Sequence, residues 1–359
     1  LEGRESTMRD FLRSLLPSSD HDRYRRTVTN ESAEFWNRLD NPRPARARLD
    51  DFRFECVLGQ GSFGTVAFAV HGATDAECAV KLAYKPRPAE DLRRIVFERN
   101  VLFACSNRFI TRLLYAFPEG AYLCLVLEYV SCGNLGDLVG APLPIATSTV
   151  KLIVAQIVLA LDYLHGLLIM HNDLKPDNIL VGSNGYIKIT DFGLAEDLRA
   201  LPDHKTQSTG GTVGFAAPEM YKKVPRGPES DWFALGVTTY ILLCKELPFP
   251  GTNVKEVGKA TLTSKPTLSV FRFQINASRC VEALMKKTPC KRLGYGGASE
   301  VMQHRWFRGV DWLALYEQTL PRPLDIRPVA KQLLRPIDLD YIKKPTHYGN
   351  TRDEWYLDF

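Results

Sequence analysis

The sequence predicts an α+β fold in two lobes, a small lobe of antiparallel strands with one helix and a larger lobe that is mainly helical. The chain has 359 residues, which is enough for two domains. Between residues 52 and 130 the apolar residues come in short β-type runs. From about residue 148 they recur at i, i+3 and i+4, as they do on helices. We therefore expect a small lobe over 52–130 and a large lobe over 131–307.

Composition and charge are those of a soluble globular protein with a sizeable core. Hydrophobic residues make up 45% of the chain and charged residues 24%. The net charge of +5 is not gathered into a basic stripe with interleaved aromatics, so we expect no nucleic-acid binding. No apolar run reaches the roughly 18 residues of a membrane span. The eight cysteines form no C-x-x-C pair, which indicates free thiols in a reducing compartment. We expect a monomer in the cytoplasm, with the nucleus left open.

The two ends of the chain lack the patterns of the lobes. Residues 1–30 are polar and basic, and we expect them to be flexible; residues 1–7 resemble a vector-derived leader, with Met8 as the native start. Residues 31–51 are predicted to be a short amphipathic helix and a linker, because Phe35, Trp36 and Leu39 have helical spacing before Asn41-Pro42. Residues 308–359 carry many prolines without a strong period, which indicates a tail.

The small lobe is predicted to hold five strands and one helix. The strands are expected over Phe52–Leu58, Thr65–Val70 and Cys78–Ala83, and around Leu113–Phe117 and Tyr122–Tyr129, with the helix over 89–105.

A glycine-rich turn, Gly59-x-Gly61-x-x-Gly64, joins the first two of these strands. The same pattern occurs in dinucleotide-binding folds, but there the glycines lead into a helix with an acid about 20 residues later. Here they join two strands, and Ala79-Val80-Lys81 follows. Glycines allow backbone N–H groups to approach phosphate oxygens closely. The context therefore predicts a hairpin over a triphosphate, with Lys81 reaching two of its phosphates.

A second polar cluster lies in the large lobe, in His171-Asn172-Asp173-Leu174-Lys175-Pro176-Asp177-Asn178. An acid, a lysine and an asparagine so close together can hold a hydroxyl, a phosphoryl group and a metal ion. The turn Asp191-Phe192-Gly193 follows. The order H-x-D-x-K-x-x-N and then D-F-G is the phosphotransfer pattern of protein kinases.

On these motifs the chain resembles a eukaryotic protein kinase over about 52–316. Lys175 in Asp-Leu-Lys-Pro-Asp-Asn is typical of the serine/threonine subgroup. Similarity to the AGC group rests on four further motifs. Within that group, the chain most resembles the catalytic subunit of cyclic-AMP-dependent protein kinase. The likeness extends to the N-terminal helix and to the terminal Tyr356–Phe359, in a family whose C-terminal tail wraps the small lobe. The four motifs are Gly211-Thr212, Ala217-Pro218-Glu219, Arg292-Leu293-Gly294 and His304-x-Trp306-Phe307.

The resemblance implies transfer of the ATP γ-phosphoryl group to serine or threonine with Mg²⁺. Asp173 would accept the substrate's proton and Lys175 would neutralise the moving phosphoryl group. Asn178 and Asp191 would hold the metal, and Glu98 would pair with Lys81. Thr212 would bond near Asp173, and Glu219 with Arg292 would form a structural ion pair. The ATP-binding residues implied are Gly59, Gly61, Ser62, Phe63, Gly64, Val66, Ala79, Lys81, Leu127, Glu128, Val130 and Leu180. An ATP-binding pseudokinase scaffold is the alternative, although none of the catalytic residues is missing.

The sequence departs from these relatives at the phosphate switch. Asn172 replaces the arginine that pairs with a loop phosphate in the family, and Glu196 replaces a second basic residue. A phosphate on the loop 194–216 would therefore gain few charge-assisted bonds. We predict activity without loop phosphorylation. The candidate phosphorylation sites are Thr206, Ser208 and Thr209, and the basic residues that could substitute are Arg199, His204 and Lys205.

Three further departures concern partners. Asn134 and Ile241 stand where the cyclic-AMP kinase has acids that bind substrate arginines, and only Asp177 is acidic, which predicts a reduced preference for basic substrates. Gln207 replaces a tryptophan of the surface that docks the regulatory subunit, which argues against control by a cyclic-AMP regulatory subunit. Around Tyr341 the tail lacks the usual acidic aromatic run, which in the family supplies an aromatic side chain that covers adenine.

Overall fold

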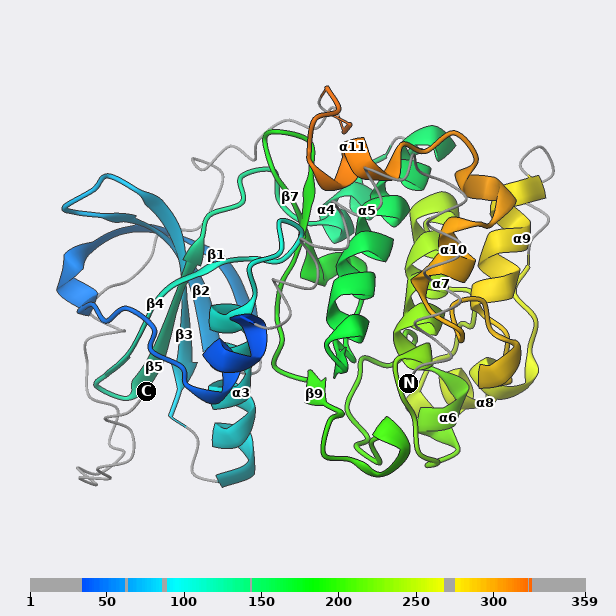
Figure 1. Cartoon of the computed structure of the whole chain (residues 1–359), viewed down its shortest axis with the longest axis horizontal. Helices are drawn as coiled ribbons and strands as arrows, with labels where there is room; N and C mark the ends of the chain where they lie inside the picture. Colours follow the sequence, from blue (N-terminus) through cyan, green and yellow to red (C-terminus); the bar gives the residue numbers. More distant parts are fainter. Residues whose placement is uncertain are drawn as a thin grey trace. The chain divides into compact units, whose positions relative to one another are not determined.

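The computed structural model describes residues 34–61, 64–85, 89–142, 144–267, 275–321 and 323–324. Its described residues form two compact units. The smaller unit holds residues 34–106 and 110–131, and the larger unit holds 107–109 and 132–324 with the gaps above. Figure 1 labels the elements of both units. The predicted segment 1–30, the terminal Tyr356–Phe359 and Tyr341 lie outside the described residues.

The smaller unit contains a five-stranded antiparallel sheet in the order β1-β2-β3-β5-β4. The five predicted strands are confirmed, with ends that shift by a few residues. β1 differs most, because it continues through Gly59 to Gly61, and Gly61 pairs with Gly64. The six-residue turn expected over 59–64 is therefore wrong, since the glycines extend the ladder and shorten the connection. The strands are β1 (Phe52–Gly61), β2 (Gly64–His71), β3 (Glu77–Tyr84), β4 (Leu113–Glu119) and β5 (Tyr122–Glu128).

The two faces of this sheet have different roles because successive side chains alternate between faces. One face forms an apolar core that includes Val80, Leu82 and Val126. The register pairs Val66 with Lys81 and Ala79 with Leu127, so these four residues share the opposite face. The alternation thus separates the residues that stabilise the sheet from the predicted ATP-binding residues.

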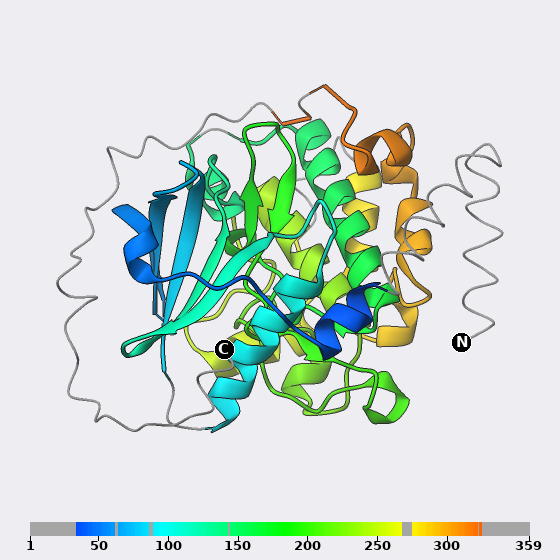
Figure 2. The same ribbon diagram turned by 60° about the vertical axis from the view of Figure 1, so that its left-hand side comes forward.

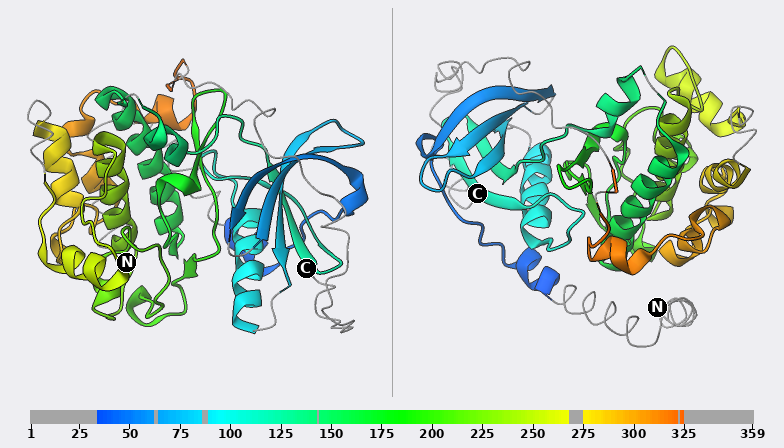
Figure 3. Two further views of the ribbon diagram at one scale, coloured as in Figure 1. Left: turned by 180° about the vertical axis from the view of Figure 1, so that it is seen from behind. Right: turned by 90° about the horizontal axis from the view of Figure 1, so that it is seen from above.

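Helix α3 (Ala89–Ala104) lies beside the sheet in the smaller unit (Figures 1 and 3). It confirms the helix predicted over 89–105. A second helix covers residues 34–40, inside the segment 31–51 for which a short helix and a linker were predicted. Its Phe35 and Leu39 are buried, as their helical spacing predicts. Arg38 and Glu34 form an exposed ion pair at 2.8 Å on this helix.

The larger unit is mainly helical, which confirms the α+β prediction (Figure 2). Its α-helices are α4 (Leu135–Gly140), α5 (Thr147–Gly166), α6 (Pro218–Tyr221), α7 (Glu229–Cys244), α8 (Val254–Thr263), α9 (Ile275–Leu284), α10 (Ala298–Met302) and α11 (Trp312–Tyr316). Short strands pair as β6 (Ile169–Met170) with β9 (Glu196–Asp197), and as β7 (Ile179–Val181) with β8 (Ile187–Ile189). The 3-10 turns of the chain are η1 (Leu49–Asp51), η2 (Pro176–Asn178), η3 (Pro202–His204), η5 (Pro289–Lys291) and η6 (Arg305–Phe307).

Helix α7 forms the centre of the larger unit, and most of its side chains are buried. It packs closely on α9 at Gly236, where an added Cβ would lie 2.8 Å from Met285 and 2.9 Å from Leu284. A side chain at this position would push the two helices apart, so the glycine is required by the packing.

Helix α5 is long and apolar enough to cross a membrane by length and composition, although charged residues interrupt its apolar run. However, 67% of its apolar window is buried within the structure. It therefore has the character of a core helix. All eight cysteines are free thiols, as predicted, and Cys290 is exposed.

Candidate active site

Asp173 lies at the centre of a hydrogen-bonded cluster in the larger unit. The Thr212 hydroxyl donates to Asp173 Oδ1 at 2.5 Å, and the Thr212 amide donates to the same oxygen at 3.1 Å. Lys175 Nζ donates to Asp173 Oδ2 at 2.7 Å and to the Thr212 hydroxyl at 2.8 Å. The cluster fixes the carboxylate and keeps an ammonium group next to it, which suits a group that accepts a proton beside a developing negative charge.

Asn178 belongs to the same cluster and fits the metal-binding role. Its Nδ2 donates to the Asp173 carbonyl at 2.9 Å and to Asp173 Oδ2 at 3.0 Å. Because the nitrogen of the amide faces Asp173, its oxygen Oδ1 points away from Asp173. No donor among the described residues binds Asn178 Oδ1. The Thr190 amide donates to the Asn178 carbonyl at 3.0 Å and so holds the turn that carries Asp191 next to Asn178. Amide and carboxylate oxygens are the hard ligands that Mg²⁺ prefers, and Mg²⁺ sites in phosphotransfer enzymes use one or two carboxylates with phosphates. The described residues contain no group of three or more His, Cys, Asp or Glu side chains that could hold a metal.

Asp231 anchors the catalytic loop to α7. Its carboxylate accepts from the amides of His171 at 2.9 Å and Asn172 at 2.8 Å, and it pairs with His165 at 2.9 Å. Burial alone would raise the pKa of Asp231, but the hydrogen bond and charge of His165, with those of the loop, hold the pKa below its ordinary value. The carboxylate is therefore charged at neutral pH. It also supports the loop where Asn172 takes a left-handed backbone conformation with φ of 68°.

Asn172 is buried and connects the catalytic loop to the loop 194–216. Its Nδ2 donates to the Leu194 carbonyl at 3.0 Å. Its Oδ1 accepts a hydrogen bond from Arg226, which is also buried. Arg226 donates further to the carbonyl of Ser208 at 2.8 Å and to that of Gly210 at 2.8 Å.

The smaller unit carries the predicted ion pair between Lys81 on β3 and Glu98 on α3. Lys81 Nζ lies 2.6 Å and 2.9 Å from the two carboxylate oxygens of Glu98. The Glu98 side chain is only 3% exposed and that of Lys81 is 14% exposed, so bulk water screens this pair little. The pair fixes the lysine at a defined position on the face that also carries Val66, Ala79 and Leu127.

The remaining predicted ATP-binding residues are distributed between the two units. Gly59, Gly61 and Gly64 lie in the β1–β2 hairpin, and Glu128 and Val130 lie at the end of the smaller unit. Leu180 is on β7 in the larger unit and forms an isolated bridge with Asn134. Ser62 and Phe63 lie outside the described residues.

Glu219 and Arg292 form the predicted ion pair of the larger unit, with both side chains almost fully buried. Arg292 donates to the two carboxylate oxygens at 2.7 and 3.0 Å. Burial alone would raise the pKa of Glu219, but the hydrogen bond and charge of Arg292 outweigh it and lower the pKa. Among the described residues, the hydrogen bonds of this pair go to Ser230, Glu229 and Lys286 and not to Asp173 or Lys175.

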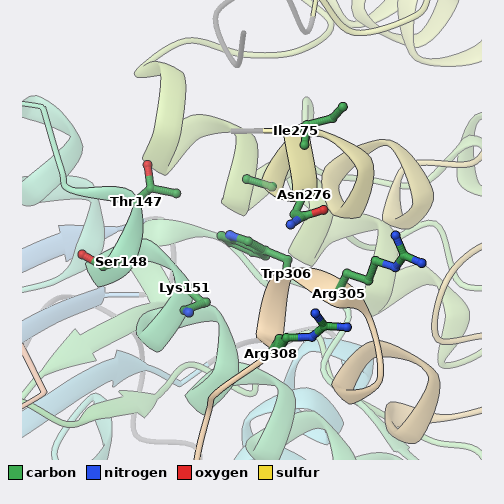
Figure 4. Close-up of a pocket in the computed structure, with 9 residues that line it drawn as sticks. Thr147, Ser148, Lys151, Ile275, Asn276, Arg305, Trp306 and Arg308 are labelled. Atoms are coloured by element: carbon green, nitrogen blue, oxygen red, sulfur yellow. The ribbon is translucent and has the colours of Figure 1, made fainter. Parts of the chain in front are cut away.

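A separate cavity of about 590 Å³ opens in the larger unit between the starts of α5 and α9 and the turn η6 (Figure 4). Trp306 lies among the side chains that line the cavity, between Lys151 on one side and Arg305 and Arg308 on the other. None of the predicted catalytic or metal-binding residues lines this cavity. It is therefore not the phosphotransfer site.

Sequence reasoning missed two residues of the site. Asp231 lies in the first turn of the apolar helix α7, and its signal in the sequence is that an acid in such a helix must find buried donors. Arg226 stands alone between Pro225 and Gly227 after Ala-Pro-Glu. A single arginine in a short Pro/Gly turn could have indicated a fixed contact, but nothing in the sequence shows that the contact is with Asn172.

Comparison with known proteins agrees with this geometry. Residues 52–307 match the family described as protein kinase domain. The chain is 35% identical over 285 residues to ribosomal protein S6 kinase alpha-2 of Mus musculus, covering 77% of this chain and 38% of that protein. It is 35% identical over 297 residues to ribosomal protein S6 kinase alpha-1 of Homo sapiens, covering 79% and 39%. It is 33% identical over 288 residues to serine/threonine-protein kinase akt-2 of Caenorhabditis elegans, covering 79% and 54%. The chain thus spans about two fifths to one half of the length of these relatives.

Proposed function

Because the chain belongs to the protein kinase family, and within it to the AGC-type serine/threonine kinases, we propose that it transfers the γ-phosphoryl group of ATP to serine and threonine hydroxyls of proteins. The observation that carries this proposal is the Asp173 cluster. A carboxylate, an ammonium group and a hydroxyl are held together in it by hydrogen bonds of 2.5 to 2.8 Å. Phosphoryl transfer needs little covalent chemistry from the protein and depends on such positioning and charge stabilisation.

Each residue has a defined part in this reaction. Asp173 Oδ2 would orient the substrate hydroxyl and accept its proton, while Oδ1 stays bonded to Thr212. Lys175 would stabilise the charge on the transferring group. Asn178 and Asp191 would hold Mg²⁺, which neutralises phosphate charge when bound. Lys81, held by Glu98, would bind ATP phosphates.

Turnover separates this proposal from the alternative of an ATP-binding scaffold. The protein is incubated with Mg²⁺, labelled ATP and a generic protein substrate. We expect incorporation by the wild type and at least a hundredfold less by Asp173→Asn, since one general base contributes roughly 10²–10⁴-fold. Equal incorporation by the two proteins, with ATP binding intact by calorimetry, would support the scaffold.

We further propose that the enzyme has a reduced preference for basic substrates. Asn134 is neutral, and its side-chain oxygen already accepts from the Asp137 amide at 3.0 Å as the cap of α4. Ile241 is a buried apolar residue of α7. Of the three positions that correspond to arginine-binding acids, only Asp177 offers a carboxylate, and it is exposed. A peptide-array profile dominated by arginine before the target serine would refute this proposal.

We also propose that activity does not require phosphorylation of the loop 194–216. Thr206 is 5% exposed, and its main chain pairs with that of Arg226 in both directions, at 2.9 and 3.0 Å. The loop is therefore already attached to the body of the larger unit through main-chain hydrogen bonds. Phosphatase treatment should leave the rate unchanged, and a loss of most of the activity would contradict this proposal. Gln207 is exposed and is polar where the cyclic-AMP kinase has a tryptophan that docks its regulatory subunit, so we propose that the chain does not bind such a subunit. A binding assay with that subunit would test this.

A further inference from the structure

The side chain of Arg226 forms hydrogen bonds to both the catalytic loop and the loop 194–216. Its side chain donates to Asn172 Oδ1 in the catalytic loop. It donates to the Ser208 carbonyl through Nε at 3.0 Å and through Nη2 at 2.8 Å, and to the Gly210 carbonyl through Nη2 at 2.8 Å. The residue is 3% exposed. A planar guanidinium with five N–H donors is suited to join several acceptors at fixed angles.

The contacts of Arg226 lead directly to the catalytic carboxylate. Gly210, whose carbonyl Arg226 binds, is followed by Gly211 with φ of 130° and then by Thr212. Thr212 donates through both its amide and its hydroxyl to Asp173 Oδ1. Fixing the Gly210 carbonyl therefore fixes the main chain two residues before the hydroxyl that orients Asp173.

Asn172 and Arg226 are complementary at this position. The Asn172 amide uses Oδ1 to accept from Arg226 and Nδ2 to donate to Leu194, so it joins the start of the loop to the arginine. A carbonyl oxygen is needed opposite a guanidinium, and a second arginine at position 172 could not supply one. The charges of Asp231, Glu196 and Glu219 surround Arg226 and oppose the effect of burial on its charged state. Glu196, which is unfavourable for a phosphate, is thus favourable for the arginine.

We propose that Arg226 is a positioning residue for catalysis, a built-in cation that holds the loop 194–216 against Asn172 and thereby sets Thr212 and Asp173 in place. This inference rests on the proposed kinase function and adds to it the residue that makes a loop phosphate unnecessary. Arg226 acts through Asn172, Gly210 and Thr212 and does not touch the reacting atoms.

The first test compares Arg226→Gln with the wild type in steady-state kinetics on one peptide substrate. We expect kcat to fall by about 10- to 100-fold, since a misplacement of about 1 Å costs roughly 10²-fold, while KM for ATP changes by less than about twofold. Guanidinium ions added at millimolar concentration should recover part of the rate of Arg226→Gln and should not raise that of the wild type. The matched control is Arg199→Ala, which removes an arginine of the same loop that pairs with Asp197 at 2.6 Å; its kcat should stay within about twofold of the wild type.

The second test exploits the complementarity of the pair. Asn172→Arg restores the residue that is common in relatives, yet it places a second guanidinium against Arg226. We expect it to lower kcat about tenfold or more, because it removes the acceptor and adds a like charge in a buried site. A rate for Asn172→Arg equal to or above that of the wild type would overturn the proposal.

A readout that needs no turnover keeps the two proposals distinguishable. In limited trypsin digestion, cleavage after Lys205 should be several-fold faster in Arg226→Gln than in the wild type, and unchanged in Arg199→Ala. If the wild type shows no phosphotransfer but this difference appears, the proposed function fails and the loop-holding role stands. If the wild type is active while Arg226→Gln matches it in kcat and in cleavage rate, the positioning role is refuted. If Arg226→Gln does not fold, Asn172→Ala must show the same lowered kcat and faster cleavage, and wild-type values in that variant also refute the role.

Discussion

Replacing Arg292 with alanine should destabilise the larger unit severely, because it would leave a buried carboxylate without its partner. Arg292 donates to Glu219 twice, at 2.7 and 3.0 Å, and to the carbonyls of Glu229 at 2.6 Å and Lys286 at 3.0 Å. Hydrogen bonds to charged groups are worth about 1.5–3 kcal/mol each, so the two to the carboxylate alone amount to roughly 3–6 kcal/mol. Breaking a buried ion pair by removing one partner costs about 3–5 kcal/mol, which agrees with that sum. We expect the free energy of unfolding to fall by about 3–5 kcal/mol in Arg292→Ala.

Urea unfolding followed by tryptophan fluorescence measures this loss. Arg305→Ala is the control, since Arg305 is exposed and forms no ion pair within the described part of the chain; its change should stay within about 0.5 kcal/mol. The double variant with Arg292→Ala and Glu219→Gln should lose less stability than the sum of the two single losses. Arg292→Ala leaves the buried carboxylate of Glu219 unpaired, and Glu219→Gln removes that charge. A loss below about 1 kcal/mol in Arg292→Ala would show that the buried pair does not support this unit.

Three further predictions concern charge and thiol chemistry. The Lys287 ammonium is buried without a hydrogen-bond partner among the described residues, and burial lowers its pKa to about 8. Between pH 8 and the model-peptide value of 10.5, Lys287 is protonated in the unfolded chain and neutral in the folded chain, so the free energy of unfolding should rise with pH. Lys287→Met should remove this rise, whereas Lys286→Met, at an exposed position, should keep it. Asp231→Asn should lower the free energy of unfolding by about 2–4 kcal/mol at pH 7. The wild type should lose stability as pH falls through the lowered pKa of Asp231, and Asp231→Asn should show a smaller loss over the same range. Thermal melts measure both effects. Ellman's reagent should label the exposed Cys290 first, because burial raises the pKa of Cys124 to about 12, and Cys290→Ser should abolish the fast phase.

The fold could be predicted largely from periodicity and turn residues. The five strands and helix α3 follow from runs of apolar residues at spacings of two or of three to four, and α5 begins where the helical spacing was expected to start, near residue 148. The end of β1 could not, because glycines such as Gly61 read as a turn in sequence and yet extend the strand when a partner, here Gly64, lies opposite.

The site divides in the same way. Residues close in sequence, such as Asp173, Lys175 and Asn178, could be placed by motif, and the pairing of Lys81 with Glu98 follows from the family resemblance. The contact between Asn172 and Arg226 could not be predicted, since the two lie 54 residues apart and neither matches a motif. Asn172 alone indicates the loss of a phosphate partner, whereas the structure shows that it has gained an arginine.

The bond between Asp231 and the catalytic loop has a consequence for when the loop can open. The amides of His171 and Asn172 are both buried and both bound to a carboxylate on α7, the most buried helix of the larger unit. Such amides exchange with solvent only when the structure around them unfolds. In deuterium they should therefore exchange as slowly as the interior of α7, although they lie outside any helix or strand. The catalytic loop thus has no regular secondary structure, but its anchored amides should be as well protected from exchange as those of the core.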